Sequence, residues 1–208
     1  LIWVAAATIL IASMVAMTKD NLKARLAYST VSQLSYIVLG AMLASKAGLI
    51  GASMHIAMHA FAKITLFFAA GAIFVASHKN RVSELNGLGR AMPVTFAAFF
   101  IGTLSIIGLP PFGGMWSKWY LGLGAVETAQ LLLLAVLMIS SLLNIIYLLP
   151  IPIRAFFSKP DNGEHYTEIA EAPKSMLLAM LVTSTACVIL FFYPDPFYRL
   201  AGLAAGGY

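Results

Sequence analysis

Long apolar stretches separated by short polar segments run along the whole chain. Six of them are candidate membrane-spanning helices, at about residues 1–17, 26–45, 48–77, 93–126, 128–150 and 174–193. A spanning helix needs roughly 20 apolar residues, whereas the strands of a membrane barrel are shorter and alternate between apolar and polar positions. The pattern therefore predicts an all-α, polytopic transmembrane helical bundle of about six spanning helices, forming a single transmembrane domain over residues 1–208.

The stretch at 93–126 is too long for one straight crossing, and helix-breaking residues occupy its middle. Proline lacks the backbone donor that a helix needs and glycine relaxes the backbone, so this segment interrupts the helix. The residues of the discontinuity are Gly108, Pro110, Pro111, Gly113 and Gly114. The stretch either turns back as two crossings or forms one discontinuous helix.

The placement of basic residues favours one discontinuous helix. A single crossing puts nine basic residues on one side of the membrane and two, Lys46 and Arg199, on the other, whereas two crossings give seven against four. Cytoplasmic loops carry an excess of Lys and Arg, so the single crossing fits better, and both ends of the chain then lie outside the cytoplasm. The nine residues are Lys19, Lys23, Arg25, Lys79, Arg81, Arg90, Arg154, Lys159 and Lys174.

Composition excludes several classes of function. Hydrophobic residues make up 61% of the chain and charged residues 10%, whereas about a quarter of an average soluble chain is charged. A soluble enzyme, a disordered regulator and a DNA-binding domain are therefore excluded. The 13 Lys and Arg residues are spread singly along the chain rather than gathered into a patch, so we expect no nucleic acid partner.

Three further segments carry smaller expectations. The chain begins at Leu1 inside an apolar stretch and without an initiator methionine, so we expect it to be part of a longer protein. Cys187 has no second cysteine for a disulfide, and we expect it to serve packing. The polar segment 151–173 is expected to be a solvated cytoplasmic connection. Its polar residues are Asp161, Asn162, Gly163, Glu164, His165, Glu168 and Glu171.

Three ionisable residues interrupt the apolar stretch at 48–77. His55, His59 and Lys63 are spaced i, i+4, i+8, which places them on one helical face. Ionisable groups in hydrocarbon cost at least ~2.5 kcal/mol each on insertion scales and usually face a bundle interior or water. Because histidine titrates near neutral pH and burial favours the neutral form of an amine, the stripe favours a proton relay.

Two other interpretations of this stripe stay open. The histidines can be hydrogen-bonded core residues while Lys63 extends toward an interface. The His-x-x-x-His pair can also bind a metal, but nothing nearby in the sequence supplies a carboxylate or thiol ligand. We therefore expect no metal. The sequence also has no Gly-rich phosphate loop, cysteine cluster or nucleophile elbow, so we expect no cofactor and no catalytic residues.

Lys118 follows the discontinuity and is a further functional candidate. Broken helices at membrane depth are tolerated where they line a cavity, and their free ends can bind or steer ions. The alternative is a structural cation paired with the C-terminal carbonyls of a helix.

Polar side chains are also frequent in the segment 23–36, where they can line a hydrated path or bond neighbouring helices. Lys23 is either a pathway residue or an ordinary interfacial anchor. Asn144, with Ser140 and Ser141, is more typical of contacts between helices.

Three motifs together resemble a known family. They are the segment 20–33, which reads DNLKARLAYSTVSQ, the stripe His55 to Lys63 followed by Leu66-Phe67-Phe68, and the segment 108–118, which reads GLPPFGGMWSK. The sequence resembles the second half of an antiporter-like proton-translocating membrane subunit. This family is shared by Mrp-type monovalent cation/proton antiporters, the proton-pumping arm of respiratory complex I and related membrane hydrogenases.

The resemblance implies a fold and a set of site residues. Family members have about fourteen helices in two inverted repeats, and this chain is similar to the last six. Lys23, His55, His59, Lys63 and Lys118 match positions on the outward-leading half of the family's proton path. The glutamate and lysine of the other half-channel would precede Leu1.

The resemblance also implies partners. These are other membrane subunits of a hetero-oligomeric complex, together with protons and Na⁺ or another monovalent cation. Lysine at position 118, where one complex I branch has glutamate, and Trp119, where another has an acidic residue, favour the D-type member of the Mrp antiporter subunits. The alternatives are a proton-pumping subunit of complex I or of a hydrogenase, with no redox centre of its own, and a structural subunit with an inert polar axis. The expected location is the bacterial cell membrane.

Overall fold

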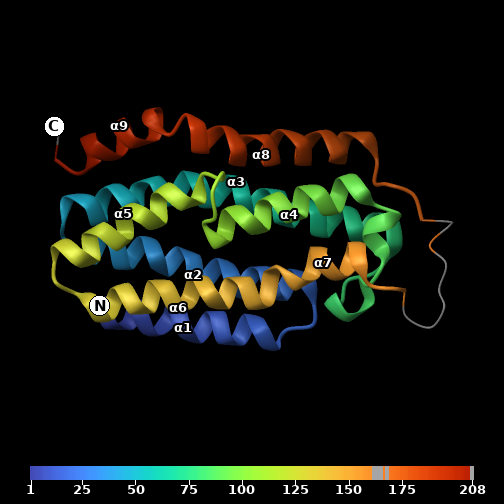
Figure 1. The fold of residues 1–208 in the computed structure, drawn as a ribbon, viewed down its shortest axis with the longest axis horizontal. Helices are drawn as coiled ribbons and strands as arrows, with labels where there is room; N and C mark the ends of the chain where they lie inside the picture. Colours follow the sequence, from blue (N-terminus) through green and yellow to red (C-terminus); the bar gives the residue numbers. More distant parts are fainter. Residues whose placement is uncertain (161–165, 167–168, 207–208) are drawn as a thin grey trace.

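A computed structural model describes residues 1–160, 166 and 169–206 as a bundle of helices (Figure 1). In the described part of the chain the only β pairing is one isolated bridge between Asn21 and Arg81. The helices are α1 (Ile2–Thr18), α2 (Leu22–Met42), α3 (Lys46–Ser77), η1 (Val82–Glu84), η2 (Leu88–Arg90), α4 (Pro93–Ile107), α5 (Gly114–Glu127), α6 (Leu131–Leu148), α7 (Pro150–Phe157), α8 (Lys174–Phe192) and α9 (Asp195–Ala204). The predicted all-α membrane bundle is confirmed.

Among the described residues, three helical segments are long and apolar enough to cross a membrane: Lys46–Ser77, Leu131–Phe157 and Lys174–Phe192. Two shorter helices, Ile2–Thr18 and Pro93–Ile107, are also apolar. α2 has sufficient length but carries many polar side chains, and several of them, including Gln33, are fully buried. Burial inside the bundle accounts for the polarity of α2, because these groups face neighbouring helices.

The stretch at 93–126 forms one broken helix. α4 and α5 follow one another along the length of the bundle, offset from each other at the break formed by residues 108–113 (Figure 1). Gly108 ends α4 with a φ of 89°, a left-handed conformation that glycine adopts without a steric penalty, and the Pro110–Pro111 bond is cis. The segments after α1, α3 and α7 consequently emerge at one end of the bundle, as the single crossing requires, and both chain ends lie at the other (Figure 1).

The predicted polar connection at 151–173 begins later than expected. α6 is followed directly by α7, so residues 151–157 are helical rather than loop. Proline is tolerated in the first turn of a helix, where its missing donor has no intrahelical partner, and Pro150 occupies such a position. Ile151 and Ala155 are buried, and Ala155 packs against η2. Residues 161–165 and Glu168 lie outside the described residues.

Glu171 fastens this connection to α4. Its carboxylate accepts hydrogen bonds from the backbone N–H groups of Val94 and Thr95, at 2.5 and 3.2 Å, and from the Thr95 hydroxyl at 2.7 Å. A carboxylate at a helix N-terminus satisfies free N–H groups and is favoured by the helix dipole. Glu171 is therefore a structural cap.

Replacing Glu171 with Ala should destabilise the protein. We expect a loss of about 1–2 kcal/mol, the upper part of the range for removed N-caps, because two backbone donors and a hydroxyl lose their acceptor. Glu127→Ala is the matched control, since Glu127 is exposed near the end of α5. Thermal unfolding of the two variants in detergent provides the comparison, and equal midpoints would contradict the capping role.

Candidate functional site

The three ionisable residues of α3 lie inside the bundle. His55, His59 and Lys63 are 2%, 6% and 5% exposed. Their spacing places them on successive turns of one face, as predicted, and that part of α3 packs against α2 and α5. The structure therefore brings all three into the interior.

His55 contacts four side chains, which come from α2, α3 and α5. Its Nδ1 lies 2.8 Å from the Ser117 hydroxyl oxygen on α5, and its Nε2 lies 3.1 Å from Oε1 of Gln33 on α2. The imidazole also stacks against the rings of Tyr36 and His59, with a centroid separation of 5.6 Å in each pair. Both ring nitrogens thus have a polar partner, and the ring itself packs against two others.

Lys63 belongs to a second set of hydrogen bonds, which joins α3, α2 and α6. Its ammonium donates to the Leu26 carbonyl at 3.1 Å and to the Ser29 hydroxyl at 2.7 Å, both on α2. The Ser29 oxygen lies 3.0 Å from the Tyr147 hydroxyl on α6, which also contacts Oδ1 of Asn144. Lys63 therefore ends inside the bundle rather than extending to an interface, and it is connected to α6 through Ser29.

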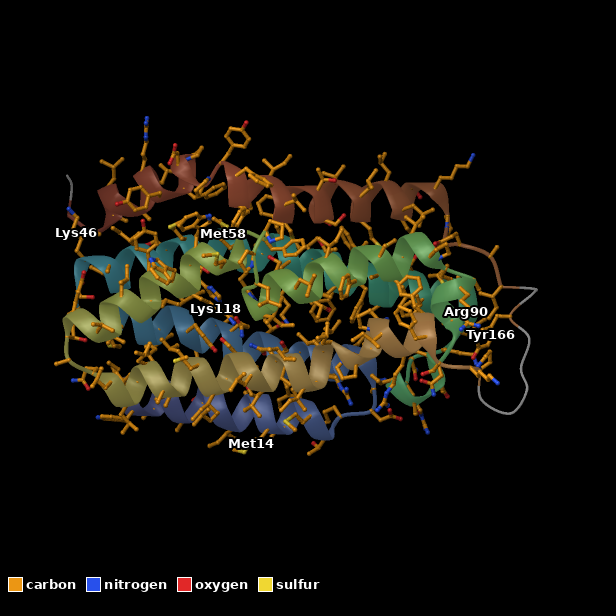
Figure 2. The ribbon with its side chains drawn as sticks, in the orientation of Figure 1. Met14, Lys46, Met58, Arg90, Lys118 and Tyr166 are labelled. Atoms are coloured by element: carbon orange, nitrogen blue, oxygen red, sulfur yellow. The ribbon has the colours of Figure 1, made fainter. Side chains whose placement is uncertain are left out.

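Lys118 lies beside the helix discontinuity (Figure 2). Its ammonium donates to the carbonyl of Ile107, the last residue of α4, at 3.0 Å, and to the Ser141 hydroxyl of α6 at 3.0 Å. The same nitrogen lies 5.2 Å from the centroid of the Tyr36 ring, within the range of a cation–π contact. The carbonyl end of α4 carries the negative end of the helix dipole, so the break supplies electrostatic stabilisation for a cation.

Two cavities between α5 and α6 reach Lys118. Their volumes are about 270 and 470 Å³, and both are otherwise lined mainly by apolar side chains. The residues common to the two cavities are Lys118, Gly122, Leu134, Met138 and Ser141. The Lys118 side chain is therefore half-buried, whereas Lys63 is buried, and it lines the space between these two helices.

His59 occupies the gap between the two hydrogen-bonded sets. It lies one helical turn from His55 and one from Lys63, and neither of its ring nitrogens has a hydrogen-bond partner among the described residues. Buried polar groups are almost always hydrogen-bonded, and bound water commonly satisfies those that lack protein partners. His59 is therefore the position where water would link the two sets.

Neither buried lysine has a carboxylate partner within the described ranges. In the part of the chain that the structure describes, the hydrogen-bond acceptors of Lys63 and Lys118 are hydroxyl and carbonyl oxygens. These acceptors also suit a neutral amine, so each lysine can change charge without breaking an ion pair.

Lys23 lies apart from this buried set. It is exposed at the start of α2, where its ammonium lies 5.0 Å from the centroid of the Phe74 ring. Arg25, two residues later, points inward and donates to the carbonyls of Lys19 at 2.7 Å and Tyr147 at 3.0 Å. Among the sequence candidates, the structure thus groups the α3 stripe with Lys118 and leaves Lys23 at the end of the bundle.

Tyr147 was not among the residues that the sequence pointed to. It is 2% exposed, and its hydroxyl connects Ser29 on α2 with Asn144 on α6. A tyrosine three residues after an asparagine in an apolar helix shares a face with it, which is a weak sign of a polar contact. By contrast, Ser140 packs in a separate group with Ser13 and Ser32, which fits the predicted contacts between helices.

α8 supports the discontinuity from the other side. The Gly113 N–H donates to the Cys187 carbonyl at 2.8 Å, and the Trp116 indole donates to the Phe191 carbonyl at 2.9 Å. Cys187 itself is buried. The described residues contain no group of three or more His, Cys, Asp or Glu side chains that could hold a metal ion.

Comparisons with known proteins agree with this arrangement. Residues 1–144 match the family described as NADH:quinone oxidoreductase/Mrp antiporter, transmembrane. The chain belongs to this family. The resemblance inferred from the three motifs is thereby confirmed.

One relative and two solved structures illustrate the similarity. NADH-quinone oxidoreductase subunit N of Desulforudis audaxviator is 40% identical over 205 residues, covering 93% of this chain and 40% of that protein. A chain of the Mrp complex from a Dietzia species superposes with a TM-score of 0.88 at 24% identity, over 98% of this chain and 46% of that one. A chain of respiratory complex I from Thermus thermophilus gives 0.85 at 22%, over 99% and 43%.

These likenesses have different weight. The two structural matches concern the fold alone, because the identities are low. The chain spans 40% of the length of the subunit N relative. It is an antiporter-like membrane subunit sequence whose relatives are subunits of multi-subunit membrane complexes.

Proposed function

We propose that this chain forms part of a proton-translocating subunit in a multi-subunit membrane complex. One observation carries the proposal: Lys63, which is buried, and Lys118, which is half-buried, have no carboxylate partner among the described residues and lie at the ends of a polar set that contains His55 and His59. Ionisable groups inside a membrane bundle are costly and typically mark ion pathways. Family membership supports the same conclusion.

The geometry supports a stepwise path. Lys118 and Lys63 each have neutral oxygen acceptors that tolerate both the ammonium and the amine, and the histidines lie between them. Protonation of one group repels charge on the next, and at an effective dielectric of about 20 two charges ~8 Å apart interact by about 2 kcal/mol. Water at His59 would complete the connection. Lys23 would act at the entrance near Arg25 rather than within the buried set.

Neutralising Lys118 tests the proposal. In vesicles containing the full-length protein within its complex, Lys118→Ala should reduce proton flux on the order of 100-fold, the scale on which positioned proton-transfer groups act. Lys46→Ala is the control, because Lys46 is an exposed lysine at the start of α3 and should transport normally. Undiminished flux through a folded Lys118→Ala complex would exclude the proposed role.

Two drivers of this proton movement have separate support. The name of the subunit N relative favours a complex that couples proton movement to quinone reduction. The fold likeness to the Mrp complex, together with Lys118 and Trp119 in the sequence, supports exchange of protons for Na⁺ or another monovalent cation. Measurements on vesicles distinguish these two mechanisms. An imposed Na⁺ gradient should drive proton flux only if the complex exchanges cations for protons, and NADH with quinone should drive it only if the complex couples proton movement to quinone reduction. The bacterial cell membrane is the location that the relative's organism supports.

A further inference from the structure

His55 has two ring nitrogens in different chemical surroundings, and this difference determines where its proton resides. Nε2 faces an amide oxygen of Gln33 at 3.1 Å, whereas Nδ1 faces the hydroxyl of Ser117 at 2.8 Å. A neutral imidazole carries one N–H, and the group opposite each nitrogen selects which one is protonated. Resting on the proposed function, we propose that Gln33 and Ser117 are positioning residues that keep the neutral His55 protonated on Nε2 and make Nδ1 the nitrogen that takes up a proton.

The Gln33 oxygen requires a donor. An amide oxygen only accepts hydrogen bonds, so the His55 Nε2 atom opposite it must carry its hydrogen. Gln33 is fully buried on α2, and the Tyr36 ring, stacked at 5.6 Å, restricts rotation of the imidazole plane. In the neutral ring Nδ1 is then left with a lone pair that points at α5.

Ser117 suits this lone pair because its single proton has two possible acceptors. Its oxygen lies 2.8 Å from Nδ1 of His55 and 3.0 Å from the carbonyl of Gly114. Opposite a neutral His55, the hydroxyl donates to Nδ1. Once Nδ1 has bound a proton it becomes a donor, so the Ser117 oxygen accepts and its O–H turns to the Gly114 carbonyl. The ring gains one proton and one positive charge, and no covalent bond of Ser117 breaks.

The Ser117 hydroxyl rotates within the first turn of α5, directly after the helix discontinuity. Gly114 is the first residue of α5, and Ser117 precedes Lys118 in the chain. When His55 becomes charged, the Ser117 hydroxyl changes its acceptor from Nδ1 to the Gly114 carbonyl. This changes the hydrogen bonding in the first turn of the helix that carries Lys118. The proton position and the helix end are coupled through one hydroxyl.

Nitrogen NMR reads the tautomer directly. The sample is the full-length protein in its complex, in bilayers, with ring-¹⁵N histidine, and the His55 signals are those that disappear in His55→Asn. At a pH where His55 is neutral, we expect a protonated Nε2 and an unprotonated Nδ1. A wild-type spectrum with the proton on Nδ1 would overturn the proposal, since the Gln33 amide would then present its NH₂ group to the ring.

Variants test the two positioning residues. Gln33→Leu removes the acceptor and should increase the Nδ1-protonated form severalfold, with Ser117 as the new acceptor. Gln130→Leu, at an exposed glutamine before α6, should leave the spectrum unchanged. Ser117→Ala leaves the Gln33 acceptor in place, so the neutral ring should keep its proton on Nε2. A proton on Nδ1 then has no Ser117 oxygen to donate to, so the doubly protonated ring should appear only at a lower pH than in the wild type. An unchanged tautomer ratio in Gln33→Leu contradicts the role of Gln33.

The NMR measurement of the His55 tautomer and the measurement of proton flux test the two proposals separately. If Lys118→Ala carries normal proton flux while His55 shows the expected tautomer, the proposed function fails and the assignment of the His55 proton holds. If flux depends on Lys118 but the proton lies on Nδ1, the positioning role fails and the proposed function holds.

Discussion

Replacing Gly114 with Ala should prevent α4 and α5 from packing and should abolish assembly of folded protein. A Cβ atom at this position would overlap the Ser105 carbonyl oxygen and would lie 2.9 Å from the Ser105 carbonyl carbon, both of which are backbone atoms of α4. Backbone atoms within a helix cannot shift alone, so the two halves of the discontinuous helix must separate. We expect a cost of about 3 kcal/mol or more, at the upper end of overpacking penalties.

Two other glycines make the measurement specific. At Gly113 a Cβ would meet Leu190 Cβ and Met58 Sδ, each at 2.8 Å, and a methionine end can move, so Gly113→Ala should cost less. At Gly202 in α9 no atom lies within 4 Å, so Gly202→Ala should be neutral or slightly stabilising. Thermal unfolding and the yield of assembled complex should rank the variants in this order, and a stable Gly114→Ala protein would show that the break tolerates a wider separation.

Local sequence signals were sufficient to predict the discontinuity and the stripe on α3. Gly108, Pro110 and Pro111 break a helix whatever surrounds them, because the effect arises within the backbone. The i, i+4, i+8 spacing similarly fixes one helical face before any packing is known. The number of crossings determines which loops lie on the same side of the membrane, and the distribution of basic residues among those loops favours a single crossing.

Contacts between distant helices were beyond the reach of sequence patterns. Tyr147 meets Ser29 across 118 positions of sequence, and no local signal encodes that pairing. Lys118 was assigned two alternative roles, and the structure shows contacts that suit both: a helix C-terminal carbonyl at Ile107 and a polar hydroxyl at Ser141. α7 was not predicted, because residues 151–157 were assigned to the polar connection, although Pro150 occupies the first turn of a helix that continues to Phe157.

Replacing Lys63 with Met should abolish proton flux and at the same time stabilise the protein. Lys63 is 5% exposed, and its only hydrogen-bond acceptors in the described chain are the Leu26 carbonyl and the Ser29 hydroxyl. Insertion scales assign a cost of at least ~2.5 kcal/mol to an ammonium group at membrane depth, and methionine fills similar space without that cost. Ser29 keeps its contact with Tyr147 in the variant, so no buried hydroxyl loses its last partner.

Opposite signs for stability and activity distinguish a transport group from a structural one. If Lys63 held the bundle together, its removal would lower the unfolding midpoint and reduce flux for that reason. If it carries protons, Lys63→Met should unfold at a higher temperature than the wild type and still pass protons no faster than protein-free vesicles. Lys63→Arg sharpens the comparison, because arginine keeps the charge but does not release its proton, so it should be inactive as well. Full activity in Lys63→Arg would mean that a fixed charge, rather than a proton that comes and goes, is what this position supplies.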